Sequence, residues 1–118
     1  MKICVINDNT VTLRNWEQLL SESVEVITFS HISRFLEKAI EDPKFFCSVE
    51  IFIADRCYYR WDLLMEKRIL ASFFEATVGA RRVLSSSQHV LGDSVDGFDL
   101  VLPQEPLSYG MLCELLGQ

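Results

Sequence analysis

The sequence has few basic residues and little proline or glycine. Lys and Arg number 11 against 17 Asp and Glu, which gives a formal net charge of −6. Because binding to nucleic-acid phosphates needs clustered cations, the chain is not expected to bind nucleic acid by itself. The 3 prolines and 5 glycines are spread out and form no linker. We therefore expect a single domain over residues 1–118.

Long apolar runs and paired cysteines are also missing. No segment reaches the ~18 apolar residues of a membrane span, and no secretory signal is visible. A cytoplasmic protein without membrane contact is therefore expected. The four cysteines, Cys4, Cys47, Cys57 and Cys113, include no Cys-x-x-Cys pair. Reduced thiols are a better interpretation than a disulfide framework or a zinc site.

Apolar residues are abundant, at 49% of the chain, which is enough for a sizeable core. Short apolar runs predict strands over residues 2–6, 24–29, 50–55, 82–85 and 98–102. Four segments with helical spacing lie between or after these strands. The first is expected to be capped by Asn9 or Thr10 and the second by Ser30. The third is expected to span residues 63–77, and the last to start at Pro106. Their inner faces are expected to include Ile40, Met111 and Leu115. Residues 89–97 have room for no more than about two helical turns.

This alternation of strands and helices predicts an α/β fold. The expected architecture is a flavodoxin-like, doubly wound, five-stranded parallel sheet in the order 2-1-3-4-5. Helices would cover both faces, and the fourth helix would be short or irregular.

Carboxylates follow two of the predicted strands. Asn7 and Asp8 come after the first strand, and Asp55 ends the third. Because a carboxylate is costly to bury, its natural place is the carboxyl end of a strand, where the chain leaves the core. In the order 2-1-3-4-5 these two ends are neighbours. The sequence therefore predicts one shallow acidic pocket that contains Asp8 and Asp55.

In element order and length, nearly the whole chain resembles the receiver domain of bacterial response regulators. The matching stretches are Asn7-Asp8, Asp55, Ser85-Ser86-Ser87 and Pro103-Gln104-Glu105-Pro106. The resemblance implies that Asp55 is the phosphoacceptor. It implies Mg²⁺ ligands from Asp8, Asp55 and the backbone carbonyl of Cys57, and phosphoryl-binding hydroxyls from Ser85 or Ser86.

The chain departs from the family pattern at two positions that carry the chemistry. Asn7 replaces an acid, so it adds no charge to a metal site, although its amide oxygen can accept a water of the metal shell. Weak Mg²⁺ binding is the most we expect, and no cofactor is required. The family's lysine aligns with Glu105 or Gln104, and no lysine follows Lys67. A unit charge pair 4 Å apart is worth about 4 kcal/mol at an effective dielectric of 20, so an inward Glu105 would repel a phosphoaspartate.

The loop after Asp55 is rich in the residue types that are enriched at protein interfaces, namely Arg56, Tyr58, Tyr59 and Trp61. Binding a partner and packing over the edge of the core are equally compatible with this composition. Arg56 is also a candidate for the missing positive charge.

These observations favour an atypical, stand-alone receiver domain that acts as a signalling protein-interaction module without phosphorylation. A sensor kinase or a downstream signalling protein is the expected partner, and a homodimer stays open. The alternative is a weakened but functional phosphoacceptor of a two-component system, modified on Asp55 with Mg²⁺. A small-ligand binder is disfavoured because residues 7–10 contain no glycine for a phosphate cradle. No nucleophile–base pair is recognisable, so no enzymatic activity beyond self-phosphorylation is expected.

Overall fold

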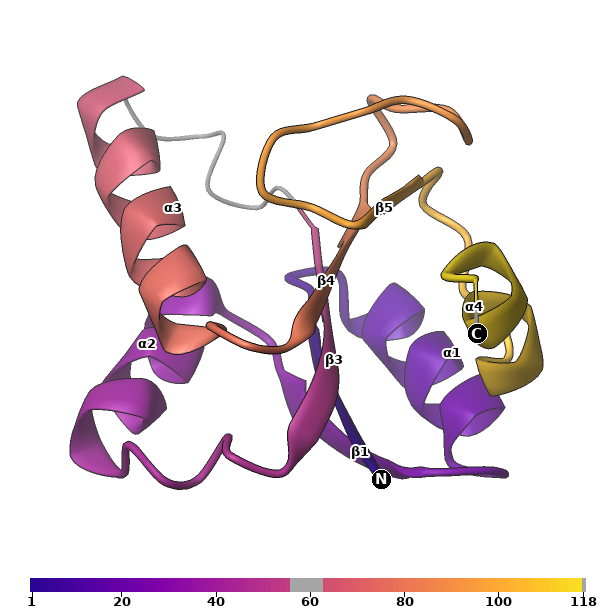
Figure 1. The fold of residues 1–118 in the computed structure, drawn as a ribbon, viewed down its shortest axis with the longest axis horizontal. Helices are drawn as coiled ribbons and strands as arrows, with labels where there is room; N and C mark the ends of the chain where they lie inside the picture. Colours follow the sequence, from indigo (N-terminus) through magenta and orange to yellow (C-terminus); the bar gives the residue numbers. More distant parts are fainter. Residues whose placement is uncertain (56–62, 118) are drawn as a thin grey trace.

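The fold is one parallel sheet between two pairs of helices (Figure 1). The computed structural model describes residues 1–55 and 63–117. The strands are β1 (Lys2–Ile6), β2 (Glu25–Phe29), β3 (Val49–Ala54), β4 (Arg81–Ser85) and β5 (Leu100–Leu102). The helices are α1 (Thr10–Leu20), α2 (Ile32–Glu41), α3 (Leu63–Ala76) and α4 (Tyr109–Leu115). All neighbouring strands are parallel, in the order β2-β1-β3-β4-β5, which confirms the predicted flavodoxin-like fold.

The two faces of the sheet hold different cores. Figure 1 shows α2 and α3 on one face and α1 and α4 on the other. Side chains alternate along β1, so that Cys4 and Ile6 join the first core while Ile3 and Val5 join the second. All 8 phenylalanines of the chain belong to the α2–α3 core or pack against it. The α1–α4 core is mostly aliphatic around the buried Trp16.

The connection from β4 to β5 contains no helix. Residues 86–99 run as turns and irregular chain, drawn in orange at the top of Figure 1. The short or irregular fourth helix expected from the sequence is therefore an irregular segment, and the described residues contain four helices.

Arg82 ties this segment to the end of α3. Its guanidinium donates to the carbonyl of Phe74 at 2.8 Å, to Oγ1 of Thr77 at 2.6 Å and to the carbonyl of Gly97 at 3.2 Å. The same guanidinium lies 4.7 Å from the centre of the Phe74 ring. One side chain thus fixes the returning chain against α3, because it satisfies carbonyls on both elements.

The fifth strand begins at Leu100, two residues later than predicted. The amide of Phe98 donates to the carbonyl of Val95, which closes a turn, and Gly97 has a φ of +89°. Phe98 packs against Phe73 and Phe74 with ring centres 6.0 and 5.6 Å apart. The apolar character of Phe98 therefore serves the aromatic core and not a strand.

Two predicted helix starts were wrong. The residue at the cap position of α2 is His31, whose side chain makes no capping hydrogen bond, so Ser30 is not the cap. Helix α4 begins at Tyr109 instead of Pro106, because Ser108 is the cap and accepts a hydrogen bond from the amide of Met111. Asn9 caps α1, as one of the two predicted candidates.

Three apolar side chains expected on inner faces are exposed. Ile40 is 80% exposed, Met111 51% and Leu115 40%. Ile40 comes five residues after the buried Phe35, which places it about 140° around α2 from that side chain. Met111 precedes the buried Leu112 by one residue, so it points about 100° away from the core stripe of α4.

The thiols of Cys4, Cys47 and Cys113 are free. None of the described helices is both long enough and apolar enough to cross a membrane.

Candidate functional site at the carboxyl ends of the strands

The predicted acidic residues lie at one edge of the sheet. Ile6 pairs with Ala54 in the β1–β3 register, so the residues that follow, Asn7 and Asp55, leave the sheet side by side. The amide of Asp55 donates to the carbonyl of Ile6 at 3.1 Å, and that of Asn7 donates to the carbonyl of Phe29 at 3.0 Å. Asp55 is only 7% exposed, whereas the neighbouring Asp8 is half-buried. We keep the name acidic pocket, from the sequence-based prediction, for the three residues Asn7, Asp8 and Asp55.

Asn7 has one orientation imposed by the start of α1. Its Oδ1 accepts a hydrogen bond from the amide of Asn9 at 2.9 Å. Asn9 in turn caps α1, because its own Oδ1 accepts from the amides of Val11 and Thr12. With the oxygen turned toward Asn9, Nδ2 of Asn7 is left buried without a hydrogen-bond partner among the described residues. An unmet buried donor costs about 1–3 kcal/mol.

The orientation of the Asn7 amide argues against a direct contact between this side chain and a hard divalent cation. The sequence left the Asn7 oxygen able to accept a hydrogen bond from a metal-bound water, and in the structure this oxygen already accepts one from the Asn9 amide. The group beside it is an NH₂ donor, which cannot ligate a metal. No group of three or more His, Cys, Asp and Glu side chains in 1–55 and 63–117 is arranged to hold a metal ion. The predicted carbonyl ligand from Cys57 lies outside the described residues.

The two candidate phosphoryl-binding serines differ in what their hydroxyls do. Ser85 is fully buried, and its Oγ donates to the carbonyl of Pro103 at 3.3 Å. The Oγ of Ser86 accepts a hydrogen bond from the amide of Gln88 at 3.2 Å, which leaves its own proton to donate. Ser86 is therefore the hydroxyl that can still serve an oxyanion, and Ser85 is part of the β4–β5 packing.

Glu105 is exposed. It lines a cavity of about 290 Å³ between β5, α4 and the β4–β5 segment, together with Leu91, Met111 and Leu115. We call this cavity the outer pocket. None of Asn7, Asp8 and Asp55 lines it. Gln104, the other candidate for the lysine position, is half-buried.

The four residues proposed for a partner loop, Arg56, Tyr58, Tyr59 and Trp61, also lie outside the described residues.

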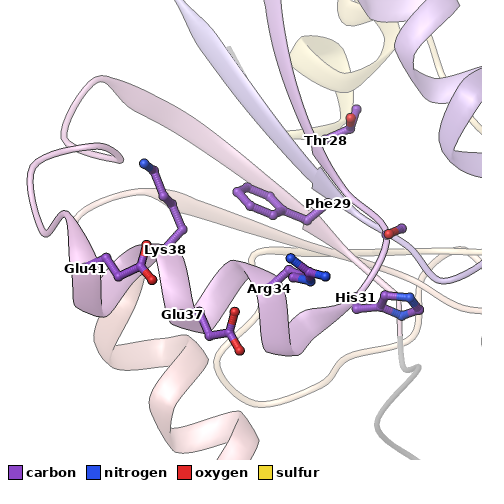
Figure 2. A pocket seen from close by; sticks show the side chains of 8 residues that line it. Thr28, Phe29, His31, Arg34, Glu37, Lys38 and Glu41 are labelled. Carbon is purple, nitrogen blue, oxygen red and sulfur yellow. The ribbon is translucent and has the colours of Figure 1, made fainter.

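A further pocket beside α2, of about 580 Å³, was not anticipated from the sequence. Figure 2 shows His31 and Arg34 at the start of the helix, with Glu37, Lys38 and Glu41 farther along it. The signal for it is the alternation of acids and bases at helical spacing. Because both signs of charge are interspersed, the pocket has no single-sign field to select an ionic ligand, and we interpret it as a solvated groove.

Two pKa values are raised at residues outside the acidic pocket. Burial raises the pKa of the Cys4 thiol in the middle of β1. A hydrogen bond with Cys113 raises the pKa of Tyr109, on α4, to about 12. Both groups belong to the packing of the sheet and α4.

Known structures share this fold at low sequence identity. The chain is similar to a response regulator receiver domain protein from Clostridium thermocellum, with 20% identity, a TM-score of 0.65, and coverage of 98% of this chain and 90% of that one. It is similar to the receiver domain of the hybrid histidine kinase CckA, with 18% identity, a TM-score of 0.67, and coverage of 100% and 97%.

A third structure is RcsB from Salmonella enterica serovar Typhimurium, bound to the rprA promoter in the presence of the phosphomimetic BeF3−. Its identity is 12% and its TM-score 0.63, with 99% of this chain and 60% of that one covered. No protein-family model and no curated protein matches the chain. With the sheet order, the helix layers and these likenesses together, the chain has the fold of the response regulator receiver domains.

Proposed function

We propose that the chain is a signalling protein-interaction module of the cytoplasm that uses the receiver fold without depending on phosphorylation of Asp55. The observation that carries this proposal is the chemistry at the end of β5. Residues 83–118 contain no Lys and no Arg, and the side chain at the lysine position, Glu105, lines the outer pocket. A phosphoryl group on Asp55 would therefore find no cation from β5 or α4.

The cost of such a modification follows from the charges. A phosphoryl group carries about two negative charges at neutral pH, and it would sit near Asp8. Each pair of unit charges about 5 Å apart repels by about 3 kcal/mol at an effective dielectric of 20. The amide of Asn7 is neutral, so it offsets none of this repulsion. Among the three side chains of the acidic pocket, the charges favour an unmodified Asp55.

The outer pocket supports the interaction role. Its apolar wall includes Leu91 and Met111, which are 56% and 51% exposed, and Val90 nearby is 66% exposed. Exposed apolar clusters of this kind mark protein-binding surfaces. Glu105 and Glu114 line the same pocket.

The charge around the outer pocket selects the partner. The acids in residues 83–118 are Asp93, Asp96, Asp99, Glu105 and Glu114, with no Lys or Arg among them. A segment that presents apolar side chains flanked by Lys or Arg complements this surface. A second copy of the same face would bring acid against acid, so the proposed partner is a different, basic protein. Nucleic acid and membrane are not proposed as partners.

Phosphorylation independence is tested with a small phosphodonor. The purified chain is incubated with Mg²⁺ and acetyl phosphate, and its intact mass is recorded beside that of Asp55→Asn. The expected result is the same unmodified mass for both proteins. A phosphorylated species that forms only when Asp55 is present would overturn the proposal.

A phosphorylated species that requires Asp55 would instead support the alternative function, a weakened phosphoacceptor. The observations in its favour are that Asp55 and Asp8 lie at one edge of the sheet and that Ser86 keeps a proton to donate. It predicts that Ser86→Ala lowers the yield of phosphorylated protein, whereas the exposed Ser87→Ala leaves the yield unchanged.

A further inference from the structure

The acidic pocket contains a buried hydrogen-bond donor, Nδ2 of Asn7, that is not part of the outer pocket proposed for partner binding. Asn7 is 1% exposed, and its Nδ2 is buried with no hydrogen-bond partner in residues 1–55 and 63–117. The oxygen of the same amide is held by the amide of Asn9 at 2.9 Å. Because α1 begins at Thr10 and depends on the Asn9 cap, the direction of the Asn7 amide is fixed by the start of that helix.

This orientation has opposite consequences for cations and for oxygen acceptors. A divalent cation prefers anionic oxygen ligands, and at this position it meets a neutral amide whose unpaired group is a donor. An acceptor, such as a water oxygen or a carboxylate oxygen, gains a hydrogen bond from the same group. The neutral amide also limits the negative charge at the ends of β1 and β3 to that of Asp8 and Asp55.

From this geometry we infer that Asn7 is the specificity-determining residue of the acidic pocket. It makes the pocket reject divalent cations, and its Nδ2 donates to an oxygen acceptor instead. Restoring a carboxylate at this one position creates a divalent-cation site. The inference deepens the proposed function but rests on a separate observation, the orientation of a single amide.

The test is a titration with Mn²⁺, whose paramagnetism broadens the backbone amide signals of nearby residues in a nitrogen-15 correlation spectrum. Three proteins are compared, namely the natural chain, Asn7→Asp and Asn9→Asp. Asn9→Asp is the matched control, because it adds the same charge two residues away at an exposed position and keeps a good helix cap. No phosphodonor and no partner are present, so the outcome is distinguishable from a failure of the proposed function.

The expected result is selective broadening at Asp8 and Asp55 in Asn7→Asp, at an Mn²⁺ concentration about tenfold or more below that needed in the other two proteins. Equal broadening in the natural chain and Asn7→Asp would overturn the inference, as would an equal gain in Asn9→Asp. If Asn7→Asp does not fold, the Mn²⁺ titration of the natural chain alone tests the inference. Selective broadening at Asp8 and Asp55 that Asp8→Asn removes would then contradict a cation-rejecting pocket, and its absence would support one.

Discussion

Replacing Gly97 by alanine should destabilise the fold through a specific collision with the Phe74 ring. Gly97 has a φ of +89°, a backbone conformation that side chains rarely adopt. A Cβ added there would lie 2.8 Å from both Cε atoms of Phe74, and closer still to Cζ. The ring has little freedom to move away, because it packs 5.6 Å from the ring of Phe98 and 4.7 Å from the Arg82 guanidinium.

The loss in the free energy of unfolding expected for Gly97→Ala has a backbone part and a steric part. Holding alanine at positive φ costs about 1–2 kcal/mol, and forcing an extra methyl group into a packed site costs about 1–3 kcal/mol. The expected loss for Gly97→Ala is therefore about 2–5 kcal/mol in the free energy of unfolding. The lower end applies if the half-buried Phe74 ring rotates aside.

Gly92→Ala is the matched control. Gly92 also has a positive φ, +100°, but a Cβ added there meets nothing within 4 Å. Only the backbone part remains, so this variant should lose about 1–2 kcal/mol. Both variants are measured by equilibrium unfolding in urea. The dependence of the free energy of unfolding on urea concentration is compared between them. Equal losses, within about 0.5 kcal/mol, would refute the placement of Gly97 over Phe74 and with it the anchoring of the β4–β5 segment.

Three further predictions concern the core, the thiols and the outer pocket. Phe35→Ala should lower the free energy of unfolding by about 3–5 kcal/mol in urea, because Phe35 is fully buried among four other phenylalanine rings; a loss below about 1 kcal/mol would contradict that packing. Because the pKa of the buried Cys4 thiol is raised above its ordinary 9.0, the unfolded chain releases this proton first. Stability should be retained below pH 9 and fall above it by about 1.4 kcal/mol per pH unit; Cys4→Ala should remove that part of the slope in unfolding measured from pH 8 to 11, and an unchanged slope would count against the assignment. A Leu- and Lys-rich amphipathic helical peptide should bind, in fluorescence anisotropy, about tenfold more tightly than its Glu-for-Lys counterpart. Met111→Lys should abolish that difference, because it puts a positive charge into the outer pocket, while Val78→Lys, at a more exposed side chain outside this pocket (78% against 51%), should not; equal binding of both peptides would argue against a basic partner.

The sheet was predictable from the sequence because its strands are buried on both faces. Ile51, Phe52 and Ile53 are all about 1% exposed, and such a strand reads as a continuous apolar run whichever face each side chain points to. The adjacency of the ends of β1 and β3, which Asp8 and Asp55 follow, was predictable from the strand order alone.

The features that the sequence did not reveal depend on contacts between distant residues or on the exact start of a helix. Phe98 has the apolar character of a strand residue, but the turn at Gly97 and the bonds from Arg82 keep it out of β5. The direction of the Asn7 amide depends on where α1 begins, and no local pattern fixes which of its two atoms is bonded. Glu105 lines the outer pocket beside α4, which begins three residues after the predicted start.

The most direct test of phosphorylation independence is the response of the natural chain to beryllofluoride, which mimics a phosphoryl group on aspartate. Nitrogen-15 correlation spectra are recorded with and without Mg²⁺ and beryllofluoride, for the natural chain and for Asp55→Asn. We predict that both proteins give superimposable spectra under the two conditions, since neither the described part of the acidic pocket nor residues 83–118 supplies a cation. Shifts that require Asp55 and extend to β4, β5 and α4 would contradict a module that works without phosphorylation.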